Sequence, residues 1–187
     1  LGYYCLASET SISKGTFDAA LSSASVALSG AKKVCESSRA VFSLCRPPGH
    51  HASKNQYGGY CFINNAAISA QYFLNHGAKR VAILDVDFHH GNGTQDIFYD
   101  RSDVMFLSLH GDPNDAFPHF LGYENEKGSD DGYEFNFNFP MPPNTNYSNW
   151  GSAFDEAAKR IAKFKADALI LSLGVDTFKD DPISFFK

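Results

Sequence analysis

Short and nearly continuous apolar runs alternate along this chain with segments whose apolar residues recur at the helical period of 3.6. Such runs occur at 40–45, 81–86, 104–109 and 168–173. A strand that is apolar on both faces must be covered on both, which is typical of a parallel sheet between layers of helices. The pattern favours the α/β class, and we expect a three-layer fold with a central, mainly parallel sheet flanked by helices.

The remaining periodic segments predict helices and one further strand. We expect helices at 16–35 with Thr16 as N-cap, at 65–76 closed by Gly77, from Thr94, and from about Ser148 to Phe164. The first helix is expected to bury the face formed by Phe17, Leu21, Ala24, Leu28, Ala31 and Cys35. Aromatic and polar residues alternate over 133–139, which predicts a strand with one aromatic face. The long polar loop before it, 111–132, is of the kind that is usually functional or disordered.

Composition excludes several classes of protein. The 187 residues, 43% of them hydrophobic, fit one domain spanning 1–187. The net charge of −5 gives no sign of the positively charged surface that nucleic-acid-binding proteins carry. No apolar run approaches the roughly 18 residues of a membrane span. The four cysteines form no CxxC pattern, so we expect reduced thiols in a cytoplasmic protein, and no secretory signal is visible.

Three of the apolar runs lead into chemically rich segments: Arg-Pro-Pro-Gly-His-His at 46–51, Asp-Val-Asp-Phe-His-His at 85–90 and Gly-Val-Asp at 174–176. Ligands of parallel sheets bind beyond the carboxyl ends of the strands. The three segments should therefore converge on one rim of the sheet.

Asp85, Asp87 and His89 are spaced two residues apart, so on an extended chain they share one face. Carboxylates crowded in this way repel one another unless a cation joins them, and a divalent metal would hold Asp87 and His89 together. A solvated strand end, or aspartates that cap the next helix, explains the same spacing.

The other two segments are ambiguous when each is taken alone. His50 and His51 follow two prolines and a glycine, which hold the backbone rigidly. Adjacent imidazoles can act as base and acid around one water or bind a metal, but they also occur as a surface pair in a turn. Asp176 alone means little, because aspartate is common after strands. Convergence of all three segments favours a metal site.

Several motifs together resemble the histone deacetylase family: RPPGHHA at 46–52, GGYCFINN at 58–65, DVDFHHGNGTQ at 85–95, SLHGDP at 108–113 and LGVD at 173–176. The stretches 111–123, 139–145 and 174–187 look closer to its bacterial branch, the acetylpolyamine amidohydrolases. The resemblance implies an arginase/deacetylase-like fold and the hydrolysis of acetyl amides.

The resemblance also assigns roles around a zinc ion, which would be bound by Asp87, His89 and Asp176, with iron or cobalt as alternatives. His50 would pair with Asp85 and His51 with Asn92. Many family members have Asp where this chain has Asn92, so His51 should be less basic here. His51 is the candidate general base for the metal-bound water, and one or both histidines would protonate the leaving amine.

The substrate implied by the resemblance is a small cationic acetylated amine, such as an acetylpolyamine. Gly59 and Tyr60 match residues that accept the amide N–H and form one wall of a tunnel, and Phe117 matches the opposite wall. Ordinary core packing is the competing explanation for these aromatic residues. Cys61 is interpreted as a packed thiol, not a nucleophile.

The family also binds potassium at two sites. The residues that match the first site are Asp85, Asp87, His89, Ser108 and Leu109, and those that match the second are Phe98, Arg101 and Val104. Oxygen-rich coordination suits such a hard cation.

We expect the chain to be truncated at both ends, because it begins at Leu1 and stops at Lys187, before the segment that supplies the family's oxyanion tyrosine. A full-length protein could be a homodimer. Three alternatives stay open: a protein acetyl-lysine deacetylase, a catalytically impaired fragment that binds acetylated amines, and an arginase-like binuclear manganese hydrolase.

Overall fold

The computed structural model describes residues 2–187 and is built around one sheet of parallel strands, ordered β3-β2-β1-β4. The strands are β1 (Val81–Asp85), β2 (Val104–Gly111), β3 (Asn136–Met141) and β4 (Ala168–Ser172). Leu1, from which the truncated start was predicted, lies outside the described residues.

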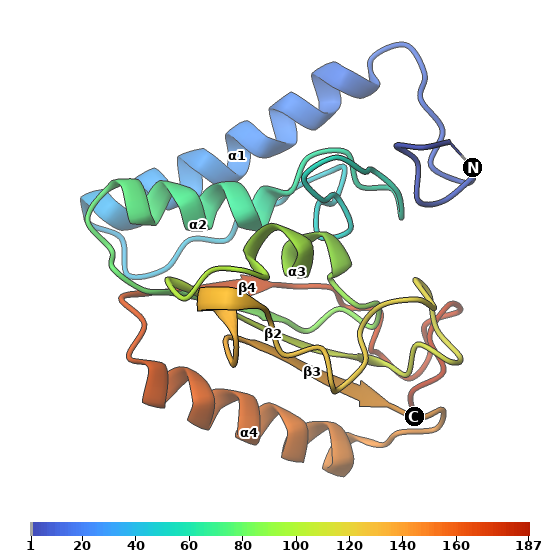
Figure 1. Cartoon of the computed structure of the whole chain (residues 1–187). Coiled ribbons are helices and arrows are strands. Elements are labelled where there is room, and N and C mark those ends of the chain that lie inside the picture. The colour runs from blue at the N-terminus through green and yellow to red at the C-terminus, as the bar shows by residue number, and fades with distance from the viewer. Residues whose placement is uncertain (1) are drawn as a thin grey trace.

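Helices cover both faces of this sheet (Figure 1). On one side lie α1 (Thr16–Glu36), α2 (Asn65–Asn75) and the short α3 (Asn92–Phe98), and on the other lies α4 (Tyr147–Phe164). A 3₁₀ turn, Asp130–Gly132, precedes β3. The predicted three-layer α/β fold with a parallel central sheet is confirmed.

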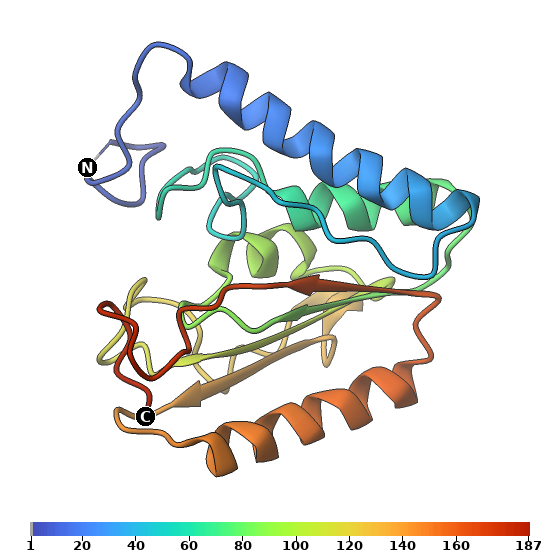
Figure 2. The same cartoon turned by 180° about the vertical axis from the view of Figure 1, so that it is seen from behind.

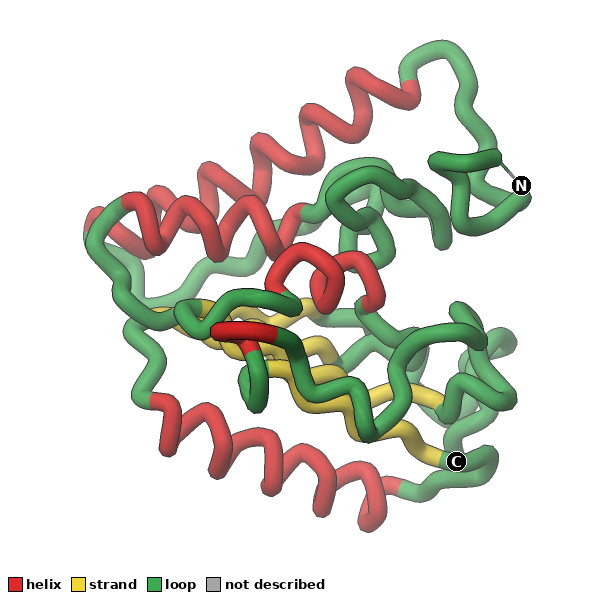
Figure 3. Tube along the Cα trace, viewed as in Figure 1, coloured by secondary structure: helices red, strands yellow, loops and turns green. Residues whose placement is uncertain are grey.

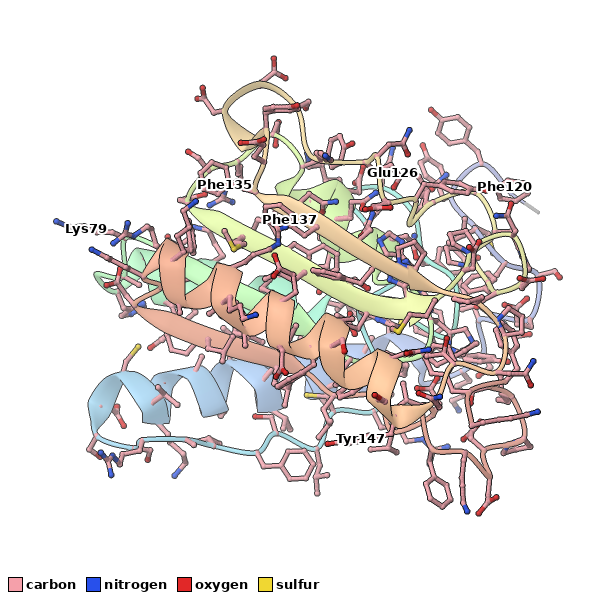
Figure 4. The ribbon with its side chains drawn as sticks, turned by 90° about the horizontal axis from the view of Figure 1, so that it is seen from below. Lys79, Phe120, Glu126, Phe135, Phe137 and Tyr147 are labelled. Atoms are coloured by element: carbon pink, nitrogen blue, oxygen red, sulfur yellow. The ribbon has the colours of Figure 1, made fainter. Side chains whose placement is uncertain are left out.

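Alternate residues of the strands enter two apolar cores. Ile83 and Phe106 face the helices α1 and α2, whereas Leu84 and Leu107 face α4. Phe137 also packs toward α4, as Figure 4 shows, with the Arg160 guanidinium 4.3 Å above its ring. The sheet is therefore buried on both faces over its β1 and β2 centre.

The predicted apolar face of the first helix is correct at Ala24 and Ala31, which are buried, but wrong at Phe17, Leu21 and Cys35, which are exposed. Phe17 is 69% exposed, and the buried residues of α1 are small: Ala20, Ser23, Ala24, Ala27, Gly30 and Ala31. Small side chains let α1 lie close to α2, and this close approach favours a different stripe from the one with the largest side chains. The helix also starts without a side-chain cap, because its N-cap is Gly15, not Thr16.

The predicted buried strand at 40–45 is also wrong. This segment is an irregular connection that runs along α1 (Figure 2), with Phe42 and Leu44 72% and 77% exposed. Its links to α1 are side-chain contacts, such as Ser43 Oγ to the Val26 carbonyl at 3.4 Å. A short apolar run does not specify a strand unless a neighbouring strand binds its backbone.

The strand β4 is an edge strand, not the buried strand expected from its apolar sequence. Leu169 and Leu171 are 55% and 49% exposed, because α4 packs over β2 and β3 and leaves this edge uncovered. The other differences concern boundaries. Helix α3 begins at Asn92, two residues early, and β3 begins only at Asn136 because Glu134 has a φ of 65°, which an extended strand does not allow.

The carboxyl ends of the strands point toward one end of the molecule, where the loops gather (Figure 3). Among residues 2–187, no helix has both the length and the apolar character needed to cross a bilayer.

Candidate metal centre and its neighbours

The three predicted zinc ligands meet beyond the carboxyl ends of β1 and β4. One ligand atom from each of Asp87, His89 and Asp176 lies within 4.8 Å of the others. The chain after β1 turns across the end of the sheet, where the His89 N–H donates to Asp87 Oδ1 at 2.8 Å. The Phe88 N–H donates to Asp176 Oδ1 at 2.9 Å and so joins this turn to the segment after β4.

The His89 ring lies between the two carboxylates, with Nδ1 3.1 Å from Asp87 Oδ1 and 2.9 Å from Asp176 Oδ2. Burial lowers the pKa of His89, but hydrogen bonds to Asp176 and Asp87 outweigh burial and raise the pKa to about 9. The carboxylates therefore require a positive charge between them, which a proton or a divalent cation can supply. Two carboxylates and one imidazole, all partly buried, suit such a cation.

Gly174 makes room for this arrangement. A Cβ at residue 174 would collide with the carboxylate and the backbone of Asp87. The segment after β4 can therefore approach the turn after β1 only because it carries a glycine here.

His50 is paired with a fully buried carboxylate. Its Nδ1 lies 2.9 Å from Asp85 Oδ2, and its Nε2 points toward Asp87 Oδ2 at 3.9 Å. Burial lowers the pKa of His50, but the charges of Asp85 and Asp87 outweigh it and raise the pKa to about 9. His50 is therefore a protonated imidazole at neutral pH when no metal is bound.

His51 has the opposite character. Its Nδ1 lies 2.6 Å from Asn92 Oδ1, and its ring stacks at a tilt on His50 with centroids 4.0 Å apart. Burial, followed by the charge of His50, holds the pKa of His51 well below its usual value. Because Nδ1–H donates to Asn92, the Nε2 lone pair of the neutral ring is free to accept a proton.

Two of the three predicted tunnel residues, Phe117 and Gly59, contact His51. The Phe117 ring meets His51 edge to face, with centroids 5.0 Å apart. Gly59 has a φ of 53° and packs so tightly against His51 that a Cβ would collide with the ring. Tyr60 is 57% exposed. That Tyr60 and Phe117 face each other as tunnel walls stays a prediction.

The family of the chain follows from a comparison with known domains. Residues 3–187 match the histone deacetylase domain. The chain belongs to the histone deacetylase family.

This chain is similar to named proteins and solved structures of known deacetylases and their homologues. An acetylpolyamine amidohydrolase of Mycoplana ramosa is 62% identical over all 187 residues, which cover 55% of that relative. The crystal structure of an acetylpolyamine aminohydrolase from Burkholderia pseudomallei has a TM-score of 0.86 at 44% identity, covering 88% of this chain and 48% of that one. A histone deacetylase homologue from Aquifex aeolicus has a TM-score of 0.91 at 30% identity over 99% of this chain and 50% of that one. The chain thus spans about half the length of these proteins.

The residues predicted to bind potassium in this deacetylase-family chain fall in two places. Ser108 and Leu109 lie on β2, where Ser108 is the register partner of Asp85. Phe98 ends α3, the Arg101 N–H donates to the Phe98 carbonyl at 3.0 Å, and Val104 begins β2. Both cation sites stay predictions.

Sequence reasoning missed a second group of residues in this family member. Two polar residues of 133–139 are not solvated, since Asn136 and Asn138 are buried and bonded to Gln95. Their alternation with Phe137 and Phe139 was visible, but nothing in it showed what would cover the polar face. Cys61 is buried, and burial raises its pKa to about 12, which agrees with a packed thiol.

Proposed function

We propose that the protein containing this chain is a zinc-dependent amidohydrolase that removes the acetyl group from small cationic amines such as acetylpolyamines and releases acetate. The observation that carries the proposal is the convergence of three candidate metal ligands, Asp87, His89 and Asp176 (the metal-binding triad of this proposal), with the tandem imidazoles of His50 and His51. The similar proteins from Mycoplana ramosa and Burkholderia pseudomallei, both named for acetylpolyamines, support this substrate class.

The metal-binding triad would hold the zinc ion, and its donor set also fits iron(II) or cobalt(II). When bound, such an ion polarises an amide carbonyl and lowers the pKa of water. His51, kept neutral by burial and by His50, would accept the proton of the attacking water at Nε2. His50, whose Nδ1 lies 2.9 Å from Asp85 Oδ2, would donate a proton to the leaving amine as the C–N bond breaks.

The substrate would reach these groups along Phe117, whose ring stands edge-on to His51. In this proposal an aromatic face packs on a methylene chain, and Gly59 and Tyr60 accept the amide N–H on the other side. Potassium at the two predicted sites, a homodimer of the full-length protein and a cytoplasmic location complete the proposal.

Incubating the zinc-loaded protein with acetylputrescine, acetylspermidine and an acetyl-lysine peptide tests the reaction, with acetate and free amine followed by mass spectrometry. We expect release from the polyamines, and preferential release from the peptide would indicate a protein deacetylase instead. Tight binding of acetylspermidine without acetate release would contradict the enzyme and indicate a binding protein.

Metal analysis of the same sample tests the centre. One zinc per chain, lost in Asp176→Ala, is expected from the triad. Two manganese ions per chain would favour the arginase-like alternative and contradict the proposal.

A further inference from the structure

A buried polar cluster lies beneath the loop that carries Phe117, outside the groups assigned to the chemistry. It comprises His90, Gln95, His110, Asn136 and Asn138, all of which are buried. Its members come from the turn after β1, from α3, from β2 and from β3. Buried polar groups are costly unless they are bonded, so their partners indicate what the cluster does.

The buried polar cluster binds the backbone of the loop. The His110 Nε2–H donates to the Gly122 carbonyl at 2.9 Å, and Asn138 Nδ2 donates to the Tyr123 carbonyl at 3.2 Å. Asn136 Nδ2 donates to the Glu126 carbonyl at 2.7 Å. The segment 122–126 is therefore fixed to the sheet by directional bonds from three side chains.

The Glu126 carboxylate completes this attachment. Its Oε2 accepts from Gln95 Nε2 at 2.6 Å and from the Gly122 N–H at 2.9 Å. Gln95 in turn accepts from Asn136 and Asn138, each at 2.8 Å. Figure 4 shows Glu126 in the loop beyond the β3 edge of the sheet. One charged group thus joins the loop, α3 and β3, and hydrogen bonds to a charged acceptor are the stronger kind.

The loop has no spare room at its attachment point. Gly122 has a φ of 107°, and a Cβ there would lie 2.8 Å from both His110 Nε2 and His90 Cγ. The Gly122 backbone therefore packs directly against the imidazoles of His90 and His110.

Phe117 lies between two fixed parts of the loop. On its N-terminal side Ala116 is buried, and its backbone N–H donates to the Asp112 carbonyl at 2.8 Å. On its C-terminal side the chain passes through the exposed Phe120 to the attachment at 122–126. The position of the Phe117 ring beside His51 therefore depends on the attachment that Glu126 completes.

We infer that Glu126, acting through Gln95 and Gly122, is a positioning residue that holds Phe117 against the substrate and sets substrate affinity. The inference rests on the proposed amidohydrolase function for its kinetic consequence, although the attachment itself does not depend on turnover.

Glu126→Ala in the complete, zinc-loaded protein tests the inference. KM for acetylputrescine should rise about tenfold with kcat within about twofold of wild type, because a loosened wall weakens binding more than chemistry. Glu126→Gln, which keeps the oxygen acceptor, should restore most of the affinity. Glu124→Ala, at an exposed residue that forms no hydrogen bond within residues 2–187, is the matched control and should change nothing. If Glu126→Ala does not fold, Glu126→Asp, which withdraws the carboxylate by one methylene, carries the same expectation.

Hydrogen exchange supplies a measurement that needs no activity. Exchange in a peptide covering 112–126 should accelerate in Glu126→Ala, while that of β1 and the zinc content stay unchanged. Wild-type KM and wild-type exchange in Glu126→Ala would overturn the inference, as would an equal loss in Glu126→Gln and Glu126→Ala. If wild type releases no acetate, the proposed function fails, and loop exchange alone then supports or overturns the positioning role.

Discussion

The charge on His89 depends on what lies between Asp87 and Asp176. With a pKa of about 9, the His89 ring carries a proton at neutral pH. The resulting positive charge offsets the two carboxylates, as a bound cation would. A proton and a metal ion therefore compete for one position.

Zinc binding at pH 7 should release about one proton from this imidazole, because the metal takes the neutral ring as a ligand. The apparent affinity should accordingly rise as the pH increases toward the His89 pKa of about 9. Calorimetric titrations in two buffers of different ionisation enthalpy measure the released protons. Binding enthalpies that do not depend on the buffer would contradict this exchange.

Gly174→Ala should weaken zinc binding without unfolding the protein. The added Cβ would meet the Asp87 carboxylate and displace a ligand, and disturbing a ligand's surroundings typically costs about 10–100-fold in metal affinity. Competition with a chromophoric chelator measures this loss. Gly151→Ala is the matched control, since a Cβ there has nothing within 4 Å. Equal affinities of the two variants would show that the close approach at residue 174 is unimportant.

Single residues were predictable where short spacing decided their position. The Asp-x-Asp-x-His spacing at 85–89 was enough to predict that Asp87 and His89 lie together, although the turn after β1 and not an extended strand brings them together. Asp176 required the additional rule that parallel strands end at one rim. Gly174 and Glu126 were not predictable, because their roles depend on the approach of segments far apart in the sequence.

At the level of elements, apolar composition predicted the type of each element better than its buried face. The run at 104–109 is a central strand, whereas 40–45, similar in composition, has no strand beside it. In α1 the closest helix approach favours small residues, so the largest apolar side chains point outward. Which face is covered depends on neighbours that a local pattern does not contain.

The attachment between β2 and the loop should make stability depend on pH. Burial lowers the pKa of His110 to about 4, and burial together with His110 also lowers that of His90. The unfolded imidazole takes up a proton near its ordinary pKa of about 6.5, before the folded one does. Stability contributed by neutral His110 is therefore complete above about pH 6.5 and is lost as the pH falls toward 4.

Urea unfolding at pH 7 and pH 4.5 measures this effect. Wild type should lose a few kcal/mol more than His110→Asn over that interval, at about 1.4 kcal/mol per pKa unit. Parallel losses in the two proteins would contradict a neutral, buried His110. Glu124→Ala serves again as a control that should retain the wild-type dependence.

Within residues 2–187, the β4 edge of the sheet is uncovered, unlike the β1 and β2 centre. Leu169 and Leu171 are exposed on β4, and Leu173 follows at the same edge. An exposed apolar edge strand is a ready template for pairing with another chain. The three-layer fold was predicted from the sequence, but this edge was not, because an apolar run looks the same whether or not a neighbour covers it.

The chain 1–187 in isolation should self-associate through this edge in a concentration-dependent manner. Leu171→Lys should shift sedimentation toward the monomer, because a charge on an edge strand opposes pairing. Tyr147→Lys, at an exposed aromatic residue on α4, is the control and should leave association unchanged. If the wild-type chain is a monomer at all concentrations, the β4 edge does not mediate self-association.

The bond from the Phe88 N–H to Asp176 spans 88 residues of sequence and joins the turn after β1 to the segment after β4. During synthesis on the ribosome, Asp87 and His89 are therefore made long before Asp176. Until β4 has paired with β1, Asp87 and His89 lack the carboxylate of Asp176. If the proposed metal centre forms, uptake of the ion would be a late event in biosynthesis, and its retention would report that β1 and β4 have paired.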